Sequence, residues 1–207
     1  GYTKNNRLGI FKHRVAPIQI NYLGYPGTIG ADYFDYIIAD KVLIPENQKQ
    51  FYSEKIIYMP HSYQPNDNKI KIPELNTTKS DHGLPNDGVV FFYFNQNYKI
   101  GINEFNIWMR ILKKIDKSVL WLVESNKWAK NNILKQAELN NINKSRIIFA
   151  NNIPHLEHLE RHRHADIFLD TFNYNAHTTA SDALWAGLPI ITKQGSQFAA
   201  RVASRLL

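Results

Sequence analysis

The chain of 207 residues contains no cysteine. This absence excludes a disulfide-stabilised scaffold and cysteine-ligated zinc, and it agrees with a reducing compartment. No apolar run reaches the roughly 18 residues of a membrane span, and the first segment, GYTKNNRLGIFKHR, lacks the apolar core of a secretory signal. We therefore expect a cytoplasmic protein that folds without disulfides and does not enter a membrane.

A concentrated stripe of positive charge is likewise absent. Lysine and arginine number 25 against 18 acidic residues, and the net charge of +7 favours anionic partners. Nucleic acid would need these cations along one face, whereas they are spread through lysine- and asparagine-rich segments. We expect most of them on a solvated surface, no nucleic-acid partner, and a phosphate-bearing small ligand held by one or two of them.

The end of the chain lacks a signal that would stop a helix. Phe198, Val202 and Leu206 keep helical spacing without a following Gly, Asn or Pro, and the chain begins with Gly rather than Met. We interpret the chain as a fragment of a longer protein, in which tandem helical repeats could precede residue 1.

What is present is a regular alternation of apolar runs and helical patterns from residue 88 onward. The run GVVFFYF (88–94) is typical of a strand buried on both faces, and Phe105, Trp108 and Leu112 share one face of an expected helix. The expected strands cover 88–94, 118–123, 146–150, 166–171 and 189–192, and the helices 103–115, 128–140, 155–164, 178–186 and 196–207. Five strand–helix units predict a doubly wound parallel α/β sheet.

The first 60 residues are less regular, with short strands expected within 17–28, 35–40 and 55–61. Residues 62–87 are polar and rich in proline, which is typical of a linker or mobile loop. We place the end of a first domain at residues 1–61, the linker at 62–87 and a second domain at 88–207.

Polar side chains follow the strands of the second domain, and ligands of such sheets bind at the carboxyl ends of the strands. Gln96 and Lys99 follow the first strand, and His155 and His158 follow the third. After the fourth strand come His177, Thr178, Thr179 and Asp182. We expect these side chains to line one crevice.

A helix that begins near Thr178 would present free N–H groups and the positive end of its dipole to an anion such as a phosphate. Lys99 would then neutralise a diphosphate as a point charge, and the amide of Gln96 would contact a base or sugar. Plainer interpretations stay open here. Thr179 and Asp182 have the spacing of a capping box, and Lys99 is one of many lysines, most of which we expect on the surface.

The histidines between residues 155 and 164 raise the question of a metal. His158 and His162 lie four residues apart on an expected helix, and His155 and His164 flank them. No H-E-x-x-H pattern accompanies them. We therefore expect no metal, and histidines that face the ligand or the solvent.

A turn rich in glycine and proline, LGYPGT, follows the first strand of the chain. It contains Gly24, Pro26, Gly27 and Thr28. The turn is either structural or presents backbone N–H groups to the same ligand across a cleft. It does not fit G-x-G-x-x-G, so a nicotinamide cofactor is not expected.

Several long motifs, in order and over nearly the whole chain, resemble the catalytic region of the O-linked N-acetylglucosamine transferase / SPINDLY family (glycosyltransferase family 41). They are APIQINYLGYPGTIGADYFDYIIAD, YSEKIIYMPHSY, FFYFNQNYKI, RIIF, EHLERHRHADIFLDTF and HTTASDALWAGLPIIT with RVASRLL. The resemblance implies a GT-B fold, in which two Rossmann-like domains hold a nucleotide sugar, preceded by tetratricopeptide repeats. The chain would hold the end of the first domain and most of the second.

The resemblance also implies a role for each candidate residue. Gln96 and Lys99 would contact the nucleotide and the diphosphate, His158 would lie near the base, and Asp182 would contact the ribose. The phosphate-binding helix start would be formed by His177, Thr178 and Thr179, and the loop that faces the donor by Gly24, Pro26, Gly27 and Thr28.

The sequence departs from the family pattern in three places. At His155 the animal enzymes carry a lysine that contacts the base, so the preferred nucleotide is open. The large domain that animal enzymes insert between the two halves is missing, and residues 62–87 take its place. The histidine motif from which catalytic assistance is usually drawn lies upstream of Gly1, so we do not expect the chain alone to catalyse transfer.

The expected activity is inverting transfer of a sugar, first of all N-acetylglucosamine from UDP-N-acetylglucosamine, to serine or threonine hydroxyls of proteins. Lys99 and the helix start at Thr178 and Thr179 would stabilise the leaving diphosphate without a metal. Two alternatives remain: protein O-fucosylation from GDP-fucose, and a non-catalytic module that binds a nucleotide sugar or a partner protein.

Overall fold

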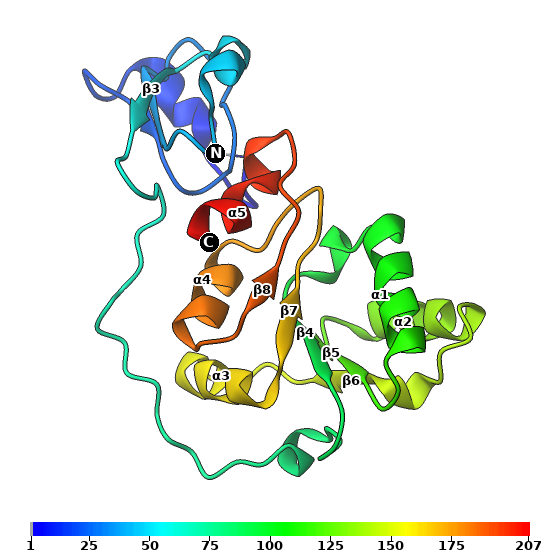
Figure 1. The fold of residues 1–207 in the computed structure, drawn as a ribbon. Helices are drawn as coiled ribbons and strands as arrows, with labels where there is room; N and C mark the ends of the chain where they lie inside the picture. Colours follow the sequence, from blue (N-terminus) through cyan, green and yellow to red (C-terminus); the bar gives the residue numbers. More distant parts are fainter. Residues whose placement is uncertain (1) are drawn as a thin grey trace. The chain divides into compact units, whose positions relative to one another are not determined.

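The computed structural model describes residues 2–207, which form two compact units (Figure 1). The first unit contains the chain up to residue 67 together with residues 194–207, and the second contains residues 68–193. Among the described residues, no helix combines the length and the apolar character that crossing a bilayer requires.

The second unit is built on a five-stranded sheet in the order β6-β5-β4-β7-β8. Its strands are β4 (Val90–Tyr93), β5 (Val119–Val123), β6 (Ile147–Ala150), β7 (Ile167–Leu169) and β8 (Ile190–Ile191). All neighbouring strands run parallel, and every residue of β4 is buried, as its continuous apolar run predicts. The chain steps outward from β4 to β6 and then returns to place β7 on the other side of β4.

Helices join these strands and cover the sheet (Figure 1). They are α1 (Ile102–Lys114), α2 (Lys127–Leu139), α3 (His155–Arg161) with the 3₁₀ turn η6 (His162–His164), and α4 (Thr178–Trp185). Phe105, Trp108 and Leu112 of α1 are buried, as the helical spacing predicts. The expected α/β order is therefore confirmed, with strand and helix ends within a few residues of the predicted ones.

The first unit contains a smaller parallel sheet in the order β1-β2-β3. Its strands are β1 (Ile20–Asn21), β2 (Tyr36–Ala39) and β3 (Lys55–Tyr58), and 3₁₀ turns lie at η1 (Leu8–His13) and η2 (Glu46–Phe51). The three strands lie within the segments where the sequence predicts them.

The last residues of the chain pack with the first unit and not with the second. Phe198 and Val202 are buried in the core of the first unit with Ile37 and Leu43. Arg201 Nε donates to the Val42 carbonyl at 2.5 Å. Residues 194–207 therefore belong to the first unit, because their apolar face fits its core. Whether each unit is a domain of the whole protein stays a prediction.

The helix expected over 196–207 is also shorter than predicted. It is divided into the 3₁₀ turn η7 (Phe198–Ala200) and the short helix α5 (Val202–Leu206). Arg201, with φ −125° and ψ −11°, separates them. The regular spacing of apolar residues survives this break because both pieces bury the same side of the chain.

We name residues 68–87 the connecting segment; it includes the 3₁₀ turn η3 (Ser80–His82). The sequence suggests a linker or mobile loop, but the segment is tied to the helices of the second unit. Trp185 Nε1 donates to the Ile70 carbonyl at 3.1 Å, and Arg163 Nη2 donates to the carbonyl of Leu75 at 2.5 Å. Leu84 is buried. The part of the linker beyond residue 67 is thus an ordered part of the second unit.

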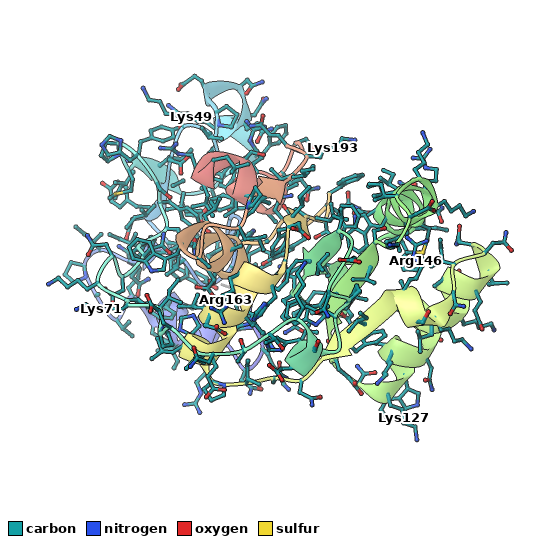
Figure 2. All side chains as sticks on the ribbon, turned by 60° about the horizontal axis from the view of Figure 1, so that its bottom comes forward. Lys49, Lys71, Lys127, Arg146, Arg163 and Lys193 are labelled. Atoms are coloured by element: carbon teal, nitrogen blue, oxygen red, sulfur yellow. The ribbon has the colours of Figure 1, made fainter. Side chains whose placement is uncertain are left out.

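The basic side chains labelled in Figure 2 come from many elements. They are Lys49 in η2, Lys71 in the connecting segment, Lys127 at the start of α2, Arg146 before β6, Arg163 in η6 and Lys193 after β8. Arg146 is itself engaged, because its guanidinium donates to the carbonyls of Leu112, Ile115 and Ser118. These labelled cations do not gather on one element, as the sequence predicts.

Candidate functional site

A cavity of about 420 Å³ opens at the carboxyl ends of β4, β5 and β6 in the second unit. We call it the strand-end cavity. It is lined by Phe94, Asn95, Gln96, Val123, Ser125, Asn152, Ile153, His155, His158, Arg161 and Thr179. Four residues that the sequence singles out, Gln96, His155, His158 and Thr179, therefore meet at one place. This position is where doubly wound sheets bind their ligands.

His158 and Arg161 form a rigid wall of this cavity. The His158 ring stacks on Phe94 with centroids 5.7 Å apart, and the Arg161 guanidinium lies 4.3 Å from the centre of the same ring. Arg161 Nε donates to His158 Nδ1 at 3.0 Å, so the proton of the neutral imidazole is on Nε2. Burial, together with the charges of His162 and Arg161, lowers the pKa of His158 to about 3. The cavity thus offers a flat, neutral N–H donor near pH 7.

Arg161 lines the cavity without having been predicted as a site residue from the sequence. It is only 3% exposed, and its Nη1 donates to the Asn151 carbonyl at 2.9 Å. Burial lowers its pKa to about 10, so the guanidinium stays charged at neutral pH. A helical arginine usually lies on the surface, and only the way α3 packs against β4 reveals that this one is buried.

The start of α4 corrects the capping-box interpretation. The N-cap residue is His177, which makes no capping bond with its side chain, and Thr179 is the second residue of the helix. The Thr179 hydroxyl is buried, and it has no hydrogen-bond partner among the described residues. Asp182 Oδ2 instead pairs with His155 Nε2 at 3.2 Å. The threonine and the aspartate are therefore not partners in a cap, and Thr179 is one of the residues that line the cavity.

The Asp182–His155 pair joins the starts of α4 and α3. Burial raises the pKa of Asp182, and the hydrogen bond with His155 opposes that rise. The His155 side chain is 52% exposed and that of Asp182 is 17% exposed. A ligand that approached the cavity along this rim would meet the imidazole before the carboxylate.

The first turn of α4 presents backbone donors, as the sequence predicts. Ala180 N and Ser181 N both donate to the His177 carbonyl, at 3.0 and 3.1 Å. The N–H groups of Thr178 and Thr179 precede these first helical bonds and lie at the positive end of the helix dipole. Thr178 is exposed and Ala180 is fully buried. The helix start can therefore receive an anion.

Lys99 lies beside the loop that leads into α4 and is not among the residues that line the strand-end cavity. Its Nζ donates to the Asn175 carbonyl at 3.1 Å and lies 4.1 Å from the centre of the Tyr174 ring. His177 stacks on the same ring at 4.9 Å. Burial lowers the pKa of Lys99 to about 8, although the Asp170 carboxylate opposes this shift. The cation is thus held next to the helix start and can lose its proton near neutral pH.

Asp170 organises that loop, although its place in the sequence indicates only the end of a strand. Its Oδ1 accepts from Thr171 N at 2.8 Å and from Ala176 N at 2.7 Å, and its Oδ2 accepts from Thr192 Oγ1 at 2.7 Å. Burial raises its pKa to about 6 against these bonds. An aspartate at the end of an apolar run was the available signal, because such a carboxylate commonly closes a turn.

The histidines of α3 and η6 do not form the metal pair that a four-residue spacing suggests. His158 lines the strand-end cavity, whereas His162 Nδ1 is bonded to the His158 carbonyl at 2.7 Å. His164 faces the connecting segment, where its Nε2 lies 2.8 Å from Thr77 Oγ1. The rings of His158 and His162 touch edge to face with centroids 4.6 Å apart, whereas His164 contacts the connecting segment.

The LGYPGT turn lies in the first unit, where its side chains and backbone support one another. Thr28 Oγ1 donates to Glu54 Oε2 at 2.5 Å and accepts from Gly30 N at 2.9 Å, and Asn21 Nδ2 donates to the Gly27 carbonyl at 2.9 Å. Gly27 and Thr28 also line a hollow of about 430 Å³, as does Pro26, whereas Gly24 faces open space. The structural interpretation of this turn is supported, and its contact with a donor stays a prediction.

Comparison with known proteins identifies relatives of this chain. The sequence profile described as glycosyl transferase family 41 matches residues 1–77 and 66–207. Over the whole chain, 40% of residues are identical to the Arabidopsis thaliana protein named "Probable UDP-N-acetylglucosamine--peptide N-acetylglucosaminyltransferase SEC". The tomato (Solanum lycopersicum) protein of the same name with SPINDLY in place of SEC is 33% identical, also over the whole chain. The chain spans 22% of the length of each of these two relatives.

The fold has a close counterpart among solved structures. A variant of the Thermobaculum terrenum O-GlcNAc transferase superposes with a TM-score of 0.84 at 25% identity, covering 97% of this chain and 38% of that one. This match confirms the predicted α/β fold of GT-B type.

The comparisons also bear on the connecting segment. Alignment with the UDP-N-acetylglucosamine--peptide N-acetylglucosaminyltransferase of Caenorhabditis elegans, 27% identical, runs over 318 positions although this chain has only 207 residues. The two stretches matched by the family profile meet at residues 66–77. Both observations agree with the expectation that this chain lacks a segment that other members carry between the two halves.

Proposed function

This chain belongs to glycosyl transferase family 41, and from that membership we propose that the whole protein is an inverting glycosyltransferase. It moves N-acetylglucosamine from UDP-N-acetylglucosamine to serine or threonine hydroxyls of proteins. The observation that carries this proposal is the strand-end cavity, which brings Gln96, His155, His158 and Thr179 together at the edge of a doubly wound sheet. We further propose that the protein acts in the cytoplasm and that tetratricopeptide repeats belong to the whole protein.

The cavity suits the nucleoside part of the donor. His158 is stacked on Phe94 and fixed by Arg161, so a planar base meets a surface that needs no reorganisation on binding. The Nε2–H of His158 is a donor for a base carbonyl, and the amide of Gln96 serves either a donor or an acceptor. Asp182, held by His155, contacts the ribose.

The diphosphate lies at the start of α4. The N–H groups of Thr178 and Thr179, the buried Thr179 hydroxyl and the Lys99 ammonium are the groups that face it. In the reaction, the acceptor oxygen forms a bond to the anomeric carbon while the bond from that carbon to the diphosphate oxygen breaks. Negative charge then grows on the leaving diphosphate, and these preorganised donors stabilise it. The acceptor oxygen gives up its proton to a general base as the new bond forms.

The test is calorimetric titration of the whole protein with UDP and with GDP, followed by a transfer assay with labelled UDP-N-acetylglucosamine. UDP should bind more tightly than GDP, and sugar should be transferred with inversion. Preference for GDP would favour protein O-fucosylation instead. Binding without transfer would favour a non-catalytic module.

A matched pair of lysine variants tests the assignment of the site. Lys99→Met should lower both UDP affinity and turnover by about tenfold or more, since one charge-assisted hydrogen bond is worth about 1.5–3 kcal/mol. Lys113→Met removes an exposed lysine of α1 and should change neither. If the two variants behave alike, Lys99 has no role in donor binding.

A further inference from the structure

Two histidines and a glutamate meet on the second unit, outside the strand-end cavity. His82 comes from η3 of the connecting segment, Glu160 from α3 and His164 from η6. One ligand atom of each residue lies within 4.8 Å of the other two. We propose that these three side chains bind a zinc ion, or a divalent transition metal of similar preference, which ties the connecting segment to α3. No part of this proposal depends on the proposed function.

The residue types fit this class of metal. Imidazole nitrogen and carboxylate oxygen are established ligands of zinc, and two histidines with one glutamate leave a fourth position for water or a hydroxyl. Glu160 and His164 are four residues apart and therefore face the same side of their helical segment. His82 completes the set from the connecting segment. Within the described part of the chain, these three residues are the group of His, Cys, Asp or Glu side chains whose ligand atoms lie close enough together to share one metal ion.

An unsatisfied nitrogen supports the same conclusion. His82 Nε2 is buried and has no hydrogen-bond partner in residues 2–207. Buried polar atoms are rarely left without a partner, and a metal ion would satisfy this one.

Neighbouring groups already orient the carboxylate. Arg163 Nε binds Glu160 Oε1 at 2.7 Å, and Thr77 Oγ1 lies 3.1 Å from Glu160 Oε2 and 2.8 Å from His164 Nε2. The Arg163 guanidinium also donates to the Thr77 carbonyl at 2.7 Å. Figure 2 shows Arg163 on the helical segment that carries the two ligands. Such outer contacts are typical of metal sites, because they fix the ligands before the metal arrives.

The electrostatics and the geometry set the cost of binding. The positive charges of Arg161 and Arg163 disfavour a metal cation near His82, whereas the negative charges of Glu160 and Asp81 favour one. Ligand atoms about 2.1 Å from a tetrahedral zinc lie about 3.4 Å apart, and those of the three residues lie within 4.8 Å of one another, so they must draw together by at most about 1.4 Å. His82 is on a short turn outside the sheet and can make this movement.

A metal at this place would be structural rather than catalytic. None of the three residues lines the strand-end cavity, although Glu160 precedes Arg161, which does. The connecting segment is also where the two stretches matched by the family profile meet. The metal would therefore hold the connecting segment against α3.

The experiment uses the whole protein, stripped with a chelator and titrated with zinc chloride in the absence of nucleotide. The protein should bind one more equivalent of zinc than the His82→Ala variant, and added zinc should raise its melting temperature by about 5 °C. Cobalt(II) should give the absorption bands of a tetrahedral site with nitrogen and oxygen ligands. His164→Gln should lose the same equivalent and the same bands.

The matched control is His61→Ala, which removes an exposed histidine and should leave zinc binding unchanged. Equal zinc stoichiometry and equal melting shifts in the protein and in His82→Ala would overturn the proposal, whatever the behaviour of His164→Gln. Because His82 lies on a surface turn, its loss should not prevent folding, which circular dichroism checks. UDP titration of the same samples reports on the proposed function separately, since zinc and UDP occupy different places.

Discussion

At the scale of single residues, the surroundings of Lys99 determine its charge. The ammonium is bonded to a backbone carbonyl and lies over an aromatic ring, yet burial still lowers its pKa to about 8. Its charge is therefore full below pH 7 and is lost as the pH rises through about 8. Any ligand that needs this charge inherits the same pH dependence.

We expect the affinity for UDP to fall as the pH rises from 7 to 9. Between the pKa of the free lysine and the higher pKa of the complex, each pH unit should cost up to about tenfold in affinity. Calorimetry at pH 7, 8 and 9 measures this slope. In Lys99→Arg the guanidinium keeps its charge, so the slope should be smaller, while any titration of the nucleotide is common to both proteins. Equal slopes would mean that Lys99 does not contact the diphosphate.

A second prediction concerns the hydroxyl of Thr179, which has no hydrogen-bond partner among the described residues. Thr179→Val keeps the shape of the side chain and removes an oxygen that has no partner in residues 2–207. The free energy of unfolding should therefore stay within about 0.5 kcal/mol or rise, whereas UDP affinity should fall by about tenfold through the loss of a bond to a charged group. Urea unfolding and calorimetry measure the two effects.

Thr3→Val, in an exposed part of the first unit, is the control for this substitution. It should leave both quantities unchanged. A Thr179→Val protein that unfolds more easily but binds UDP normally would assign the hydroxyl to the fold.

At the scale of elements, α4 begins without a side-chain cap but ends with a cap that is formed by the backbone. Gly187 N donates to the Leu184 carbonyl, and Leu188 N donates to the Ala183 carbonyl, which together form a Schellman motif. Gly187 has φ +80°, a conformation that side chains with a Cβ rarely adopt. The Gly-Leu-Pro that follows the helix in the sequence is thus a stop signal with a physical cause.

Replacing glycine by alanine should lower the free energy of unfolding by different amounts at Gly187 and at Gly88. Gly187→Ala meets no neighbouring atom and should lose only about 1 kcal/mol of unfolding free energy through backbone strain. At Gly88, which precedes β4 with φ +108°, an added Cβ would lie 2.1 Å from the Lys117 carbonyl oxygen. Gly88→Ala should therefore lose more than about 3 kcal/mol. Urea unfolding of both variants tests the order, and a reversed order would show that the backbone at residue 88 can move freely.

The elements themselves were largely predictable, because their causes are local. A run such as Val90–Tyr93 can be buried on both faces only inside a parallel sheet, and Trp108 and Leu112 share one face of a helix whatever else surrounds it. The start of α4 was harder. Threonine and aspartate three residues apart fit a cap equally well, and the pairing of Asp182 with His155 depends on a contact 27 residues away.

At the scale of the whole molecule, the chain returns to its first unit at its end. Phe198 is 3% exposed and packs edge-on against Tyr63 at 5.1 Å. A helical pattern in residues 196–207 predicts which face is buried but not which core receives it, because the partners are more than a hundred residues away. For the same reason the sequence placed His158 at the site but missed Arg161, whose burial depends on the packing of α3.

Phe198→Ala should weaken the first unit selectively. Removing this ring should cost about 3–5 kcal/mol in the unit that contains it. Hydrogen exchange should therefore accelerate in β2 and β3 and stay unchanged in β4 and β5. The control, Phe168→Ala, removes a fully buried ring of β7 and should show the opposite distribution. Equal acceleration in both units for either variant would mean that they unfold as one.

The reversal of strand order at β4 has a consequence for how the protein is made. Lys99 follows β4 and Asn175 follows β7, and their hydrogen bond spans 76 residues. During synthesis, β5 and β6 are complete before β7 can dock beside β4, and such distant contacts form late. A nucleotide held at this place would recognise only the finished unit and would protect it from unfolding. If the proposed function is correct, the amount of the protein in a cell should therefore follow the supply of the nucleotide sugar.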